Sequence, residues 1–165
     1  MKRPRPTRAP ERAPLPRFAI DVGYSARRPW VPRRAEFAAW AAAAAHAVSR
    51  RPMALSVRVV GAARSRSLNA HYRRKARPTN VLSFAGPGRG ADGLTHLGEL
   101  VICAPVVARE ARNLRVAARA HWAHMTVHGV LHLLGFDHGR ADQARRMAAK
   151  EIQILDRIGF SNPYA

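Results

Sequence analysis

The sequence predicts a single α+β domain, a small mixed sheet of about four strands packed with about five helices. Its 165 residues suit one domain with a hydrophobic core. Strand-like and helix-like segments follow one another in the order strand, helix, strand, helix, strand, strand, and then helices. Neither an internal repeat nor a second domain is visible. Together, these observations favour helices packed on one sheet.

The first 17 residues are expected to form a disordered tail outside the domain at 18–165. Five prolines interrupt this stretch, and it is rich in basic residues and poor in apolar ones. We expect the tail to add nonspecific affinity for RNA.

The elements of the domain follow in order. A strand over 17–24 alternates apolar and polar residues. An alanine-rich helix over 35–50 and a second strand over 53–61 come next. A polar helix over 65–75 is stopped by the proline at 78, and a third strand follows over 79–84. Glycines indicate a flexible loop over 86–93 before a fourth strand over 96–103. Two or three helices are expected over about 104–135 and 141–158.

The charge balance points to a polyanionic partner. Twenty-nine lysines and arginines face ten acidic residues, so the formal net charge is +19. Such a field attracts nucleic acid or an anionic membrane surface, although a solvated basic surface is the simpler alternative. No apolar run is long enough to span a bilayer. The single cysteine, Cys103, excludes an intrachain disulfide and suits the cytoplasm, where we expect the protein.

The stretch HGVLHLLGFDH, residues 128–138, predicts a metal site. His128 and His132 are four residues apart, so on a helix they share one face, and Gly135 provides a turn before His138. Three neutral ligands leave a fourth coordination position open, as in catalytic zinc sites. We expect one Zn²⁺ per chain, with Ni²⁺ or Cu²⁺ also compatible. The alternative is three ordinary histidines packed on one helix.

The same spacing occurs in the long zinc-protease motif H-E-x-x-H-x-x-G-x-x-H. Here Gly129 stands where that motif has its general-base glutamate. The missing base argues against peptide hydrolysis.

The histidine helix is expected to be largely buried, with one polar stripe. His121, His124, His128 and His132 follow at spacings of three, four and four, and apolar residues fill much of the remaining circumference. Such a stripe needs polar partners. His121 and His124 could line a cleft or form structural hydrogen bonds. Asp137 could orient an imidazole or serve as a turn residue.

A second cluster, LNAHYRRKARPTNVLSF, spans residues 68–84. It combines a basic helix end with an apolar strand. Its cations are phosphate-binding candidates, and Tyr72 and His71 could stack on bases. The basic residues are Arg73, Arg74, Lys75 and Arg77.

Several stretches resemble the YbeY family of bacterial rRNA-maturation endoribonucleases. SLNAHYRRKARPTNVLSF resembles the family's S-L-N-x-x-Y-R-x-K-D-x-P-T-[DN]-V-L-S-F, LGELVIC resembles L-G-D-[IL]-V-I-C, and residues 128–138 contain H-G-x-L-H-L-x-G-x-D-H. NPY at 162–164 resembles the family's terminal motif. Two departures are Ala76, where the family has aspartate, and Glu99, where it usually has aspartate.

The resemblance implies a single-strand-specific, metal-dependent endoribonuclease that acts in 16S rRNA 3′-end maturation and ribosome quality control. It implies metal ligands at His128, His132 and His138 and a functional arginine at Arg73. The partners would be precursor 16S rRNA, the small subunit or ribosome, and ribosome-associated proteins. Glu99 is a conceivable base. A noncatalytic metal-containing ribosome-assembly factor and a metallopeptidase remain as alternatives.

Overall fold

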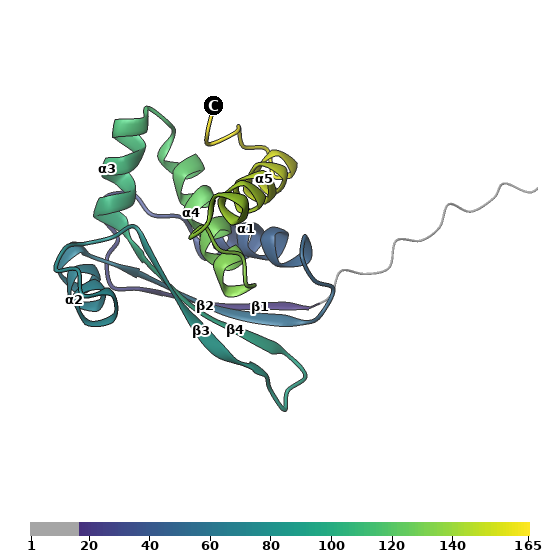
Figure 1. The fold of residues 1–165 in the computed structure, drawn as a ribbon. Helices are drawn as coiled ribbons and strands as arrows, with labels where there is room; N and C mark the ends of the chain where they lie inside the picture. The colour runs from purple at the N-terminus through teal and green to yellow at the C-terminus, as the bar shows by residue number, and fades with distance from the viewer. Residues whose placement is uncertain (1–16) are drawn as a thin grey trace, which may run out of the picture.

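The computed structural model describes residues 17–165 and has a four-stranded sheet with α1, α4 and α5 lying on one side of it (Figure 1). The predicted tail lies outside the described residues except for Arg17, whose carbonyl accepts a hydrogen bond from the Met53 amide at 3.0 Å. The elements, in order, are β1 Phe18–Tyr24, α1 Arg34–His46, β2 Met53–Val60, α2 Ala62–Arg73, β3 Val81–Arg89, β4 Thr95–Cys103, α3 Ala104–Leu114, α4 Ala118–Leu133 and α5 Ala141–Arg157.

The sheet is mixed, with the strand order β1-β2-β4-β3. β1 and β4 both run parallel to β2, and β3 pairs antiparallel with β4 at one edge. A helix connects each pair of strands up to β3, whereas β3 and β4 form a hairpin. The α+β class and the mixed sheet predicted from the sequence are confirmed.

The expected flexible loop over 86–93 is wrong for residues 86–89, because β3 continues to Arg89, and residues 90–93 form the turn of the hairpin. Gly88 lies opposite His96 and Arg89 opposite Thr95 across the hairpin. An irregular register between Ala85 and Gly88 accommodates the proline at 87, which an edge strand tolerates. Pairing with β4 therefore overrides the weak strand propensity of glycine and proline.

Helix α4 is the centre of the core. It packs on the sheet beside α1, α3 and α5, and contacts α1, α3, α5, β3 and β4. Trp122, Val127, Val130 and Leu131 are fully buried in it, so the predicted buried helix is confirmed. The histidine stripe follows the one side that this packing leaves less covered.

A second, smaller apolar cluster lies on the other face of the sheet, where α2 packs. It joins Leu82 and Val101 with Cys103, and Leu68 of α2 packs against it. Cys103 is fully buried and free, as expected for a core thiol. None of the helices within residues 17–165 is long and apolar enough to cross a membrane.

A partly buried polar network ties α3 to α4 and to the start of β3. Glu110 of α3 accepts a hydrogen bond from Asn80 at 3.2 Å and lies 2.8 Å from Nε2 of His121 in α4. Burial raises the pKa of Glu110, but the hydrogen bonds from His121 and Asn80 outweigh burial, so the net pKa is lowered. His121 therefore makes a structural hydrogen bond, one of the two roles considered for it.

Glu110→Gln should lower the free energy of unfolding by about 1 to 2 kcal/mol at neutral pH. A carboxyl with a lowered folded pKa stabilises the fold above its unfolded pKa and loses that contribution as the pH falls through the folded pKa. The difference in unfolding free energy between wild type and variant should thus stay constant as the pH falls to 4.5, the usual pKa of a glutamate, and shrink below that pH. Urea titrations across this range measure it, with the exposed Asp156→Asn as control. A difference in unfolding free energy that does not change with pH would contradict the stabilising role of the Glu110 carboxylate.

Candidate metal centre

The last two turns of α4 and the turn after it bring three histidines together. His128 and His132 lie on one face of α4 with ring centroids 4.8 Å apart. Gly135 has a φ of +93° and ends the helix: its amide donates to the His132 carbonyl, and the Phe136 amide donates to the Leu131 carbonyl, both at 3.0 Å. This turn reverses the chain, and the ring of His138 lies 4.8 Å from that of His132.

The three side chains fit a metal ion. Each offers one ligand nitrogen, and these nitrogens all lie within 4.8 Å of one another. A tetrahedral zinc ion with bonds of about 2.0 Å places its ligand atoms about 3.3 Å apart, so the nitrogens would move closer together to hold one. No fourth histidine, cysteine or carboxylate of residues 17–165 joins this group. The donor set is three imidazoles with one side open, the arrangement expected of a catalytic site.

The local charges favour the protonation state that a metal needs. The pKa of His132 is lowered by burial and by the neighbouring His128 and His138. A lowered pKa keeps the imidazole neutral near neutral pH, and only the neutral ring can bind an ion.

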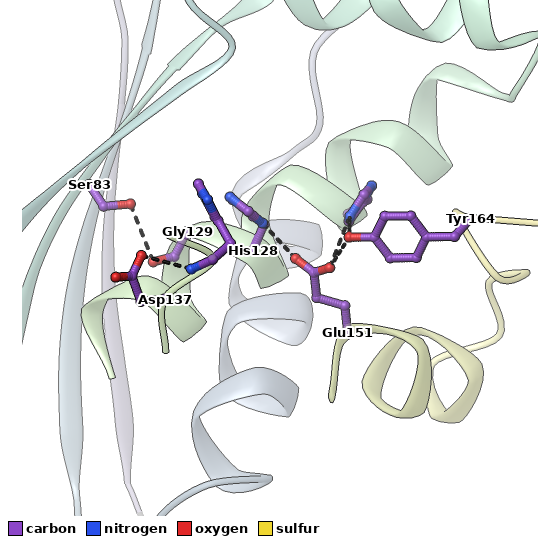
Figure 2. Close-up of polar contacts among 8 residues, drawn as sticks. Ser83, His128, Gly129, Asp137, Glu151 and Tyr164 are labelled. Atoms are coloured by element: carbon purple, nitrogen blue, oxygen red, sulfur yellow. Dashed lines mark hydrogen bonds and ion pairs between the residues drawn. The ribbon is translucent and has the colours of Figure 1, made fainter. Parts of the chain in front are cut away.

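Gly129 explains why this motif has no glutamate between its first two histidines. Residue 129 is buried and points at the sheet: a Cβ there would lie 2.7 Å from Cδ2 of Leu100. The Gly129 carbonyl also accepts a hydrogen bond from the Ser83 hydroxyl at 3.3 Å (Figure 2). A side chain at this position would collide with the core and would not face the metal site.

A cavity of about 700 Å³ opens beside the histidines and carries basic side chains. Arg73 and Lys75 line it together with His128, His132 and His138. Part of its wall comes from Ser83 and Ala85 of β3. The predicted metal ligands and the predicted functional arginine are therefore neighbours, although they are far apart in sequence.

Two buried polar residues of α2 hold the basic loop in place. The Asn69 side-chain amide donates to the Arg77 carbonyl at 2.8 Å. The Ser65 hydroxyl donates to the Thr79 carbonyl and accepts from the Thr79 amide, at 2.9 and 3.0 Å. Sequence reasoning missed both anchors, which fix the backbone on either side of Pro78.

The other predicted substrate-binding residues lie outside the cavity wall. Arg74 ends α2 in a left-handed conformation with φ 56°, and Arg77 is exposed in the loop. Tyr72 is 59% exposed and packs edge-on against Phe84, 4.8 Å between ring centroids. It lines a separate hollow on the α2 side of the sheet. Of the four, only Lys75 faces the histidines.

Glu99 is not brought to the metal centre. It alternates along β4 with Leu100, which packs under α4, so its side chain lies on the opposite face of the sheet. There Oε2 of Glu99 lies 3.5 Å from Nε of Arg58. This placement corrects the idea that Glu99 could act as a base beside the metal.

The Asp137 carboxylate binds backbone amides of the turn after α4. Its carboxylate accepts a hydrogen bond from the His138 amide at 2.7 Å, and hydrogen bonds from the backbone of His138 and Gly139 lower its pKa. No imidazole hydrogen-bonds to it within the described chain. Of the two roles considered, the turn role fits, and the turn supports His138.

A buried carboxylate that sequence reasoning missed lies behind the triad. Oε1 of Glu151, in α5, lies 2.6 Å from Nδ1 of His128. Its Oε2 accepts a hydrogen bond from the Tyr164 hydroxyl and lies 3.5 Å from Nε2 of His124 (Figure 2). His124 thus belongs to the back of the site. The only sequence signal was an acid on the buried side of an amphipathic helix.

The fold and the site together have the features of a metal-dependent hydrolase for an anionic substrate. The family model described as Endoribonuclease YbeY matches residues 31–159. An Endoribonuclease YbeY from Alkalilimnicola ehrlichii is 48% identical over 154 residues, covering 90% of this chain and 92% of that protein. The solution structure of a Thermotoga maritima protein shares the fold at 18% identity, with a TM-score of 0.52, covering 86% of this chain and 91% of that one. The chain belongs to the YbeY family.

His132→Ala should abolish stoichiometric zinc binding, because two imidazoles cannot hold the ion as three do. Metal analysis after dialysis against zinc measures this. Chelation should lower the melting temperature of the wild type and leave that of the variant unchanged, since only the wild type has bound metal to lose. His96→Ala removes a histidine from the β3–β4 hairpin and should retain the metal. Equal zinc content in wild type and His132→Ala would refute the ligand assignment.

Proposed function

We propose that the protein is a single-strand-specific, metal-dependent endoribonuclease that acts in the cytoplasm on the 3′ end of precursor 16S rRNA and in ribosome quality control. The observation that carries the proposal is that one cavity holds both the histidine triad and the cations Arg73 and Lys75. Zn²⁺ is the proposed ion, with Ni²⁺ or Cu²⁺ compatible with the same ligands. The ribosome or its small subunit, and proteins associated with it, are the proposed partners.

The charge of the molecule supports a nucleic-acid substrate. The net charge of +19 is spread over the folded domain as well as the tail. Such a field raises the rate at which a polyanion reaches the surface, and its effect falls with ionic strength. Family membership supports RNA as that polyanion, and the 16S 3′ end and single-strand preference follow the family resemblance.

The cavity has the groups that phosphodiester cleavage requires. When bound, the metal would act as a Lewis acid on a phosphoryl oxygen and lower the pKa of a water molecule. Arg73 has a planar guanidinium that can bind two phosphate oxygens and stabilise the charge that develops on them. Lys75 adds a second cation on the same wall. Ser65 and Asn69 anchor the backbone at Thr79 and Arg77, in the loop that follows these cations.

The two alternatives make different predictions. A metallopeptidase needs a general-base carboxylate at position 129, where a Cβ would point at the sheet and lie 2.7 Å from Cδ2 of the buried Leu100. A noncatalytic assembly factor would use the same cavity to bind RNA and would not cut it. The open side of the triad favours catalysis, because structural zinc sites have four protein ligands.

Arg73→Ala should retain zinc and lose cleavage of a single-stranded RNA carrying a 16S 3′ precursor end. We expect a loss of about 100-fold or more, because a cation that stabilises transition-state charge is removed. Arg73→Lys should recover part of the rate, since lysine retains the charge and loses the bidentate geometry. Gel analysis of end-labelled RNA under single-turnover conditions measures these rates.

Arg66→Ala is the matched control, because it removes the same charge from an exposed position on the same helix. It should cleave at nearly the wild-type rate. His132→Ala, purified in parallel, exposes any contaminating nuclease. Equal cleavage by all variants would refute the active site, and RNA binding without cleavage by any of them would favour the assembly factor.

A further inference from the structure

Glu151 is an acidic side chain in the protein interior, where a charged group is energetically unfavourable. It is 1% exposed, and no lysine or arginine of the described chain pairs with it. Burying an ionised carboxylate is unfavourable unless hydrogen bonds replace its hydration. Hydrogen-bonding groups surround it: Nδ1 of His128 lies 2.6 Å from Oε1, the Tyr164 hydroxyl donates to Oε2, and Nε2 of His124 lies 3.5 Å from Oε2.

A carboxylate accepts hydrogen bonds, so its contact with His128 determines which nitrogen of that ring carries the proton. Because Oε1 of Glu151 lies 2.6 Å from Nδ1 of His128, that nitrogen is the donor. In the neutral ring the other nitrogen, Nε2, then has a free lone pair. This is the nitrogen available to a metal shared with His132 and His138.

The second oxygen of Glu151 is held by the C-terminal segment. The Tyr164 hydroxyl donates to Oε2 and lies 3.4 Å from Nε2 of His124 (Figure 2). The Tyr164 amide donates in turn to the side-chain oxygen of Asn162 at 2.8 Å, which forms a tight turn. The chain of contacts thus runs from the C-terminal turn through Tyr164 and Glu151 to His128.

We propose that Glu151 is a positioning residue for the metal centre, that it holds His128 in the tautomer and orientation that bind the ion, and that Tyr164 holds Glu151. A carboxylate behind a metal-binding imidazole also increases the basicity of that imidazole. The C-terminal turn would then be part of the metal site. The inference rests on the proposed metal site and adds residues to it.

A competing interpretation is a second ion held by His124, His128 and Glu151, whose candidate ligand atoms also lie within 4.8 Å of one another. The distances favour the hydrogen bond. Two ligands of one tetrahedral zinc ion are about 3.3 Å apart, whereas the 2.6 Å between Glu151 and His128 is a hydrogen-bond length. A second ion would also need the Nδ1 that donates to Glu151.

The test measures Zn²⁺ affinity by competition with a chromophoric chelator, without RNA. Glu151→Gln should weaken binding by roughly 10- to 100-fold. Glu110→Gln is the matched control, because it removes a carboxylate bonded to another α4 histidine, His121, which is not a ligand. It should leave the affinity unchanged. In the metal-free protein, nitrogen NMR should find the His128 proton on Nδ1 in wild type and on both nitrogens in Glu151→Gln.

Tyr164→Phe tests the hydrogen bond from Tyr164 to Glu151, and it provides a second test if Glu151→Gln does not fold. It should weaken zinc binding several-fold and add little to Glu151→Gln, since both act through one contact. Tyr24→Phe removes a comparable hydroxyl, which donates to the Pro32 carbonyl far from the site, and should have no effect on affinity.

Several results would overturn the inference. Wild-type affinity in Glu151→Gln, or in Tyr164→Phe if the first variant does not fold, would leave no positioning role. A lower melting temperature of the metal-free variant with unchanged affinity would assign Glu151 a structural role only. Two zinc ions per wild-type chain, falling to one in Glu151→Gln, would establish the second-ion interpretation. If His132→Ala lost zinc while Glu151→Gln and Tyr164→Phe kept the wild-type affinity, this inference would be refuted and the proposed metal site would still be supported.

Discussion

The metal centre depends on how closely α4 packs on the sheet. At Gly129 the helix touches Leu100, and no side chain fits between them. This contact buries one side of α4, and the adjacent side, which carries the histidines, faces the cavity and α5. Because the helical period places His128 and His132 one turn apart, they share that side. The helix then ends at Gly135, and the turn that follows brings His138 back to the same point.

The histidine stripe divides into parts with different partners. His121, in the first turn, lies against Glu110 and ties α4 to α3. His124 and the Nδ1 edge of His128 face Glu151, so protein groups account for the buried half of the stripe. His132, His138 and the remaining nitrogen of His128 have no protein partner in the described chain and converge on the cavity that Arg73 and Lys75 line. The cost of burying polar groups is thus met by carboxylates at one end, and the proposed metal ion would meet it at the other.

The sequence predicted the elements and the triad because both depend on local spacing. Alternation and helical periodicity located the strands and helices, and histidines at i and i+4 before a glycine located the triad. The remaining features depend on contacts that no local pattern encodes. Glu99 and Val101 share one face of β4, and since that face also carries apolar residues, alternation alone could not place Glu99 away from α4. Glu151 lies 23 residues from His128 on another helix, so its role appears only when α5 is packed. Residues 86–89 form a strand only because β4 pairs with them.

The central claim is that three histidines hold an ion whose open side faces RNA. Substituting Co²⁺ for the native metal makes the coordination visible, because the absorption of cobalt depends on ligand number and geometry. The account predicts a four-coordinate spectrum that shifts when a non-cleavable single-stranded RNA binds, and no such spectrum in His132→Ala. A spectrum that shows a closed site and does not change at saturating RNA would contradict it.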